Sequence, residues 1–187
     1  MTEPRRGLPP VIGAAARILV LGSFPGEESL RRREYYGHPR NQFWPIMGAL
    51  VGAGPELAYA ERLRRLMAAG IALWDVLDSC RREGSLDQRI ETQARRPNDL
   101  AALAAGHPGL RHVVLNGTMA AALYTRLPPD RHPGLPATAL PSTSPAHARL
   151  RPAEKLERWR VVLAPLLAPQ ISTCVPSSTT RPGGMRK

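Results

Sequence analysis

Short apolar runs that alternate with stretches of helical spacing constrain the fold of this chain more than any other feature. The clearest run covers residues 18–21, Ile-Leu-Val-Leu, and ends at Gly22, as expected for a strand buried on both faces. Strands of this kind that alternate with helices are typical of a parallel sheet covered by helices. The sequence therefore predicts an α/β sandwich with strands at residues 17–21, 71–76, 111–115 and 137–140.

The segments between these strands predict helices, because their apolar residues recur at helical spacing. Asn98 is expected to be the N-cap of one helix, since asparagine side chains accept hydrogen bonds from the free N–H groups of a first turn. Residues 23–40 are predicted to form a loop. The expected helices cover residues 41–51, 55–69, 98–105, 118–124 and 151–167.

The length of 187 residues suits one packed core. We expect an N-terminal arm at residues 1–16, one domain at residues 17–168 and a disordered basic tail at residues 169–187, which is rich in Ser, Thr, Pro, Gly and Arg. The chain begins without the apolar core of a signal peptide, and no apolar run is long enough to span a bilayer. The two cysteines lack metal-ligand spacing. These features predict a cytoplasmic monomer without a metal or cofactor.

The formal net charge is +11, and Lys155 and Lys187 are the only lysines among 26 basic residues. Such an excess of arginine favours a polyanionic partner, because guanidinium forks match phosphate oxygens and phosphate contacts release counterions. An arginine-rich genomic base composition would give the same balance. Charge alone therefore leaves nucleic-acid binding as one of two interpretations.

Three of the predicted strands lead directly into polar segments, at residues 22–41, 116–117 and 141–147. In open α/β sheets, ligands bind beyond the carboxyl ends of the strands. The sequence therefore predicts that these three segments meet in one site.

The first polar segment contains two motifs, Gly-Ser-Phe-Pro-Gly at residues 22–26 and Tyr-Tyr-Gly-His-Pro-Arg-Asn-Gln-Phe-Trp at residues 35–44. Glycines allow a backbone to approach a planar ligand, and the aromatic residues offer stacking faces. The pair resembles the hypoxanthine/uracil-DNA glycosylases, the sixth family of the uracil-DNA glycosylase superfamily. More distantly, it is similar to the mismatch-specific uracil-DNA glycosylases. The resemblance runs from about Arg17 to Leu167, and it implies a three-layer α/β/α sandwich with a short, mainly parallel sheet.

The resemblance also implies roles for individual residues of the first segment. The mismatch-specific enzymes have an asparagine where this chain has Phe24, so the amide that orients the attacking water comes from Asn41 instead. Helix N-capping is the alternative role for Asn41, and the two roles are compatible. Tyr36 corresponds to the aromatic residue that stacks on the extruded base, and Gly22, Ser23 and Phe24 line the base pocket.

The second segment places Asn116 at the end of a strand. Uracil and hypoxanthine both show a carbonyl acceptor beside an N–H donor, whereas cytosine and adenine show an amino donor beside a ring nitrogen. One fixed carboxamide therefore complements both deaminated bases and leaves polar groups unpaired against both parent bases. The alternative is a turn asparagine before Gly117.

The third segment resembles the superfamily motif that meets DNA at the lesion. Its hydroxyl and backbone N–H groups at Ser142, Thr143 and Ser144 are expected to contact the flanking phosphates. His147 stands where the resembling family has an asparagine, and we expect another phosphate contact there, with general-acid catalysis as an alternative. Without the resemblance, the segment is an ordinary Ser/Pro loop.

Together, these features predict a monofunctional glycosylase that flips deaminated bases, hypoxanthine or uracil, out of DNA and hydrolyses the N-glycosidic bond to leave an abasic site. An amide is too weak a base to deprotonate water early, so a largely dissociative transition state is expected. Two alternatives stay open. One is a binding module that grips a damaged or single-stranded base without hydrolysis, and the other is a hydrolase of small nucleosides, which would not need the basic surface.

Overall fold

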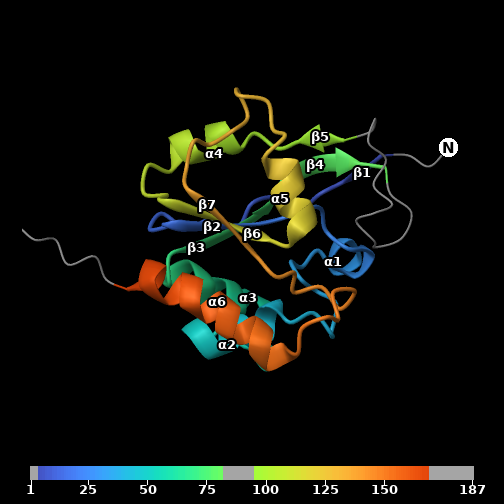
Figure 1. The fold of residues 1–187 in the computed structure, drawn as a ribbon, viewed down its shortest axis with the longest axis vertical. Helices are drawn as coiled ribbons and strands as arrows, with labels where there is room; N and C mark the ends of the chain where they lie inside the picture. Colours follow the sequence, from blue (N-terminus) through green and yellow to red (C-terminus); the bar gives the residue numbers. More distant parts are fainter. Residues whose placement is uncertain (1–3, 82–94, 169–187) are drawn as a thin grey trace, which may run out of the picture.

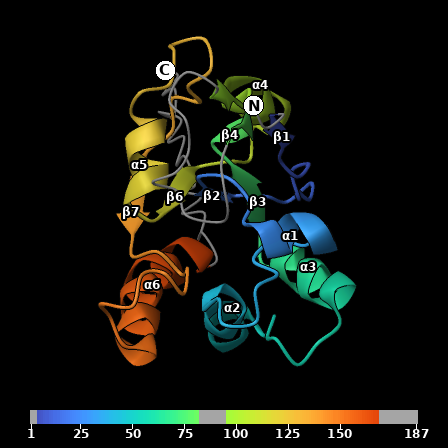
Figure 2. The same ribbon diagram turned by 90° about the vertical axis from the view of Figure 1, so that its right-hand side faces the viewer.

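The central sheet carries four parallel strands in the order β3-β2-β6-β7. The computed structural model describes residues 4–81 and 95–168. The strands are β2 (Ile18–Gly22), β3 (Ile71–Asp75), β6 (His112–Asn116) and β7 (Ala137–Leu140). Each lies within one residue of its predicted bounds, and Figure 2 shows their order across the sheet. The predicted parallel sheet is confirmed.

Helices cover both faces of this sheet because successive side chains of its strands point to opposite sides. Leu19 and Leu21 of β2 pack with residues of α4 (Leu100–Gly106) and α5 (Thr118–Tyr124). Ile18 and Val20 belong to the other core cluster, with α2 (Phe43–Val51), α3 (Tyr59–Ala68) and α6 (Pro152–Leu167). Figure 1 shows the resulting three layers, which confirm the α/β/α sandwich.

Two parts of the fold differ from the predictions. The segment predicted as a loop contains a short helix, α1 (Glu27–Arg32), which has only one buried residue and therefore lacks an apolar stripe. A small antiparallel sheet joins β1 (Arg5–Arg6), β4 (Leu77–Cys80) and β5 (Arg96–Pro97). Two of its strands have only two residues, too few for an alternating pattern to be visible in the sequence.

The predicted N-cap at Asn98 is wrong, because the cap of α4 is Asp99. The Asp99 carboxylate accepts a hydrogen bond from the backbone N–H of Ala102 at 2.9 Å. Asn98 is buried, and its amide donates instead to the backbone carbonyl of Asp75 at 2.9 Å. Its side chain therefore fixes the end of β3.

The segment predicted as an N-terminal arm packs against the domain. Arg5 and Arg6 pair with β4, and Val11 exchanges two backbone hydrogen bonds with Leu73 of β3, at 2.9 and 2.8 Å. The predicted tail at residues 169–187 lies outside the described residues. In the part of the chain that the structure describes, no helix is long and apolar enough to cross a membrane.

Candidate active site at the carboxyl ends of the strands

A cavity of about 490 Å³ opens beyond the carboxyl ends of the parallel strands. The last residues of β2, β3 and β6, which are Gly22, Asp75 and Asn116, all line it. The three polar segments therefore meet in one site, as predicted. The lining includes all ten predicted site residues: Gly22, Ser23, Phe24, Tyr36, Asn41, Asn116, Ser142, Thr143, Ser144 and His147.

Gly22 lies directly against the carboxylate of Asp75. A Cβ atom at residue 22 would overlap with Oδ1 of Asp75 and lie 3.7 Å from the hydroxyl of Tyr36. Asp75 is itself buried, with 4% of its surface exposed. A glycine is therefore required here because a buried carboxylate and a tyrosine hydroxyl converge on the end of β2.

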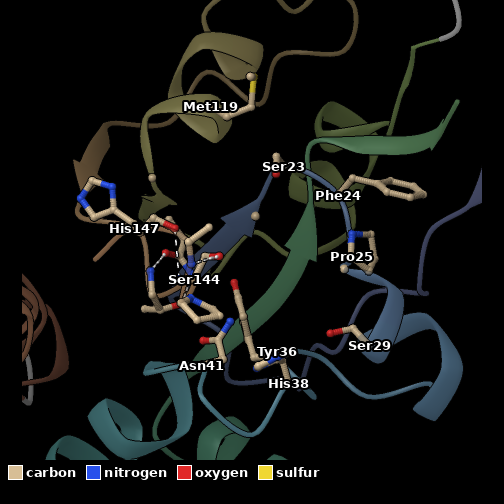
Figure 3. A pocket seen from close by; sticks show the side chains of 18 of the residues that line it. Ser23, Phe24, Pro25, Ser29, Tyr36, His38, Asn41, Met119, Ser144 and His147 are labelled. Atoms are coloured by element: carbon tan, nitrogen blue, oxygen red, sulfur yellow. Dashed lines mark hydrogen bonds between the residues drawn. The ribbon is translucent and has the colours of Figure 1, made fainter. Parts of the chain in front are cut away.

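The side chain of Phe24 points away from the centre of the cavity (Figure 3). Its ring is buried in the core cluster between the sheet and α4 and α5, and it lies 3.5 Å from the Cβ position of Gly7. The ring therefore cannot stack on a ligand in the cavity, and only the main chain at this residue remains to contact one.

Tyr36 forms an aromatic platform in the cavity. Its ring stacks on that of Phe43, with centroids 3.9 Å apart and an interplanar angle of 23°. Its backbone is left-handed, with φ of 54°. Burial, and then the negative charge of Asp75, raise the pKa of the Tyr36 hydroxyl, while the nearby Asn116 amide lowers it in part. The tyrosine is therefore neutral at physiological pH, and its hydroxyl end lies beside Asn116.

Asn41 lies next to Tyr36 at the cavity (Figure 3). Its Oδ1 accepts a hydrogen bond from the backbone N–H of Phe43 at 3.0 Å, and its own backbone N–H donates to the carbonyl of His38 at 2.8 Å. The side chain therefore supports the turn that leads into α2, but the N-cap of that helix is Gln42, so the alternative role of Asn41 as the N-cap is wrong. An amide oxygen has a second lone pair and the amide nitrogen has two N–H groups, so this bond leaves hydrogen-bonding capacity toward the cavity.

Asn116 and Thr143 form a reciprocal pair of hydrogen bonds inside the site. The Asn116 amide donates through Nδ2 to the Thr143 hydroxyl at 2.9 Å, and the Thr143 backbone N–H donates to Asn116 Oδ1 at 2.9 Å. Thr143 has no exposed surface, so its hydroxyl does not reach a phosphate in this conformation. Here the structure differs from the predicted phosphate contact, because a buried hydroxyl satisfies the buried amide of Asn116.

The rest of the third segment lies at the rim of the cavity. Ser142 Oγ accepts from the backbone N–H of Ser144 at 3.2 Å, and the backbone N–H of His147 donates to the Ser144 carbonyl at 3.0 Å. Gly117, with φ of 104°, leaves no room for a Cβ atom, which would lie 2.8 Å from Ser142 Cβ. These contacts hold the loop at residues 142–147 close to the start of α5. Ser142, Ser144 and His147 are half-buried and line the opening.

Several lining residues were not among the predicted site residues. Met119 follows Gly117 on the first turn of α5, and its place after a strand-end Asn-Gly pair was the signal that could have found it. Ser29 lies on α1, the helix that the sequence did not predict, and its hydroxyl accepts from the backbone N–H of Gly37 at 3.1 Å. Within residues 4–81 and 95–168, no three His, Cys, Asp or Glu side chains cluster as metal ligands would.

Comparison with known proteins agrees with this arrangement. A family model described as the uracil DNA glycosylase superfamily matches residues 9–164. A hypoxanthine DNA glycosylase of Methanosarcina acetivorans is 36% identical over 159 residues, which cover 84% of this chain and 97% of that protein. One from Methanosarcina barkeri is 40% identical over 114 residues, 60% of this chain and 71% of that protein.

A solved structure gives the same result for the fold. A solution NMR structure of a Methanosarcina acetivorans protein, described as a uracil DNA glycosylase, has a TM-score of 0.73 and 35% sequence identity, and the match covers 88% of this chain and 99% of that one. The family model spans the four parallel strands, all three polar segments of the cavity and the helices up to all but the last residues of α6. The chain therefore belongs to the uracil DNA glycosylase superfamily.

Proposed function

We propose that this protein is a DNA glycosylase that removes hypoxanthine and uracil by hydrolysing the N-glycosidic bond and leaves an abasic site. One observation carries the proposal: two carboxamides from different parts of the chain, Asn41 and Asn116, line the same cavity as the aromatic platform of Tyr36. The two similar proteins from Methanosarcina are named hypoxanthine DNA glycosylases, which supports hypoxanthine as a substrate.

Access to the glycosidic bond requires the damaged nucleotide to leave the helix. Deaminated bases form weaker or mismatched pairs, so their extrusion costs less than that of a normal base. The extruded base stacks on the face of the Tyr36 ring that Phe43 does not cover. Because the Tyr36 hydroxyl lies beside Asn116, a base on this platform brings one polar edge to the Asn116 amide.

Asn116 recognises the carbonyl that deamination creates. Thr143 engages one N–H group and one lone pair of the Asn116 amide, which leaves one N–H group and one lone pair. The remaining N–H donates to the carbonyl of hypoxanthine or uracil. In adenine or cytosine an amino group occupies that place, and two facing donors leave both groups unpaired at a cost of about 1–3 kcal/mol.

Asn41 orients the water that attacks C1′ of the sugar. Its Oδ1 is fixed by the N–H of Phe43, so the amide is preorganised rather than freely rotating. An amide cannot deprotonate water early, and the glycosidic bond therefore breaks before the water adds. Negative charge develops on the leaving base, and we assign its stabilisation to the main chain of residues 22–26, which lines the cavity.

The rim residues and the net charge complete the interaction with DNA. Ser142, Ser144 and His147 stand at the opening, where the phosphates beside an extruded nucleotide pass, and their hydroxyl and imidazole groups can donate to phosphate oxygens. The net charge of +11 adds affinity that does not depend on sequence and that falls as salt rises.

The test is a panel of end-labelled duplexes that carry hypoxanthine, uracil, xanthine or thymine at one position, incubated with the protein and then treated with alkali. Cleavage at hypoxanthine and uracil only after alkali is the expected result, because the product is an abasic site. Tight binding of these duplexes without abasic sites would instead identify a binding module. Release of bases from free nucleosides but not from DNA would identify a nucleoside hydrolase.

A further inference from the structure

Thr143 is a buried residue of the cavity whose hydrogen bonds reach both of the segments that carry the site asparagines. It has no exposed surface, and three hydrogen bonds hold it. Its N–H and its hydroxyl bind Asn116, each at 2.9 Å, and its carbonyl accepts from the backbone N–H of Gln42 at 2.9 Å. Gln42 directly follows Asn41. One threonine therefore connects the strand-end asparagine to the segment that carries the other asparagine.

The two bonds between Thr143 and Asn116 fall on one edge of the carboxamide. The backbone nitrogen and the hydroxyl of a single threonine are near neighbours, so their partners must be the lone pair of Oδ1 and the N–H of Nδ2 that lie side by side. The other lone pair and the other N–H then point away from this edge, on the two sides of the carboxamide. Asn116 can therefore offer a base a single N–H donor, but not two adjacent groups, while Thr143 stays in place.

Thr143 also decides which end of the carboxamide faces which way. A backbone N–H can only donate, so Oδ1 must lie against it, and a flipped amide would set one N–H against another. The hydroxyl adds the second bond, which prevents rotation of the amide plane. The position of the remaining N–H is therefore imposed by residue 143.

We propose that Thr143 is a positioning residue for base recognition, which holds the Asn116 carboxamide so that an N–H group faces the base carbonyl. This inference rests on the proposed glycosylase function. The sequence suggested that Asn116 pairs with both the carbonyl and the N–H of the base. With Thr143 in place, Asn116 instead pairs with the carbonyl alone. Since hypoxanthine and uracil share that carbonyl, Thr143 acts equally on the removal of both bases.

The test compares Thr143→Val with Thr143→Ser in single-turnover excision of hypoxanthine and of uracil from duplex DNA. Valine matches the shape of threonine and keeps both backbone bonds, and it removes only the acceptor for Asn116 Nδ2. Thr143→Val should slow removal of both bases roughly tenfold, the effect of leaving one buried donor unpaired. Thr143→Ser, which keeps the hydroxyl, should restore most of the rate.

A matched control and a double variant separate positioning from a general loss of stability. Thr138→Val makes the same substitution on β7, where the hydroxyl binds His112 Nε2 at 2.9 Å away from the cavity, and it should leave the rate unchanged. In an Asn116→Ala background, Thr143→Val should cause no further loss, because it acts only through that amide.

Each outcome of this experiment has a distinct meaning. Losses that add up in the double variant, an unchanged rate in a folded Thr143→Val protein, or a loss confined to one of the two bases would overturn the positioning role. Failure of the unaltered protein to release either base from DNA would overturn the proposed function itself. Melting temperatures measured on the same preparations show whether each variant is folded.

Discussion

Replacement of Asn41 by alanine tests the catalytic step most directly, because the structure gives this side chain two separable tasks. In the turn before α2, it accepts one hydrogen bond from the N–H of Phe43 at 3.0 Å. Loss of one such hydrogen bond costs about 1 kcal/mol, which lowers the melting temperature by roughly 2–4 °C in a protein of this size. Loss of a preorganised group that orients the attacking water should slow the single-turnover rate by about a hundredfold or more.

Two further variants separate these tasks. Asp99→Ala removes the cap of α4, whose bond to the N–H of Ala102 is 2.9 Å long, at a place outside the cavity. The accompanying exposed ion pair with Arg131 adds little to stability. Asp99→Ala should therefore lower the melting temperature about as much as Asn41→Ala, with an unchanged rate. Asn41→Ser keeps a side-chain oxygen that can accept from the N–H of Phe43 but has no amide, so it should melt nearly normally and be as slow as Asn41→Ala.

The assay uses enzyme in excess over a labelled hypoxanthine duplex, so that product release does not enter the measured rate. Lesion affinity and melting temperature are measured on the same preparation, and binding should persist in all three variants. A folded Asn41→Ala protein that cleaves at nearly the normal rate would refute the catalytic role and leave Asn41 only its structural role in the turn before α2. The search for the residue that orients water would then turn to His147 and Asp75, which also line the cavity.

Four other predictions follow from individual contacts. Asn116→Asp should slow removal of hypoxanthine and uracil together by about tenfold or more in single-turnover assays, because it replaces the donor with an acceptor; a loss for one base alone would contradict a shared carbonyl contact. Gly22→Ala should lower the free energy of unfolding, measured by chemical denaturation, by about 1–3 kcal/mol, because the added Cβ overlaps the Asp75 carboxylate. The control Gly106→Ala adds a Cβ that meets no atom within 4 Å and should cause no such loss. Tyr36→Leu should weaken lesion binding by about tenfold or more, the contribution of one stacked base, while Tyr36→Phe should keep it; equal losses in both variants would mean that the hydroxyl, not the ring, holds the base. Burial lowers the pKa of the Lys155 ammonium, so the charged form is disfavoured in the folded state, and Lys155→Met should raise the melting temperature at pH 7, with a gain that shrinks as pH rises toward the ordinary lysine pKa and is lost above it; a gain independent of pH would show that charge is not the cause.

The sequence by itself determined the sheet and the place of the site. Strands buried on both faces, such as β2, appear as continuous apolar runs, and this pattern needs no knowledge of the partners that cover them. Once the strands are parallel, their carboxyl ends meet at one edge. The polar segments after β2, β6 and β7 were therefore brought to one cavity by topology alone.

Only the tertiary structure decided what the individual polar groups do there. Asn98 and Asp99 are both good capping residues, and the choice between them depended on burial of Asn98 against the Asp75 carbonyl. Phe24 lies in a pocket motif, yet its ring packs into the core. Such outcomes depend on neighbours distant in the sequence, which no local pattern encodes.

The pair of Asn116 and Thr143 shows the same division most clearly. The sequence placed both residues at the site, but they are separated by 27 positions, and each was assigned a ligand outside the protein. In the folded chain they satisfy each other, because a buried amide without a partner costs more free energy than one bonded to a nearby hydroxyl and N–H. Hydrogen-bonding capacity is a property of the residue type, whereas the share of it that remains for a ligand is set by packing.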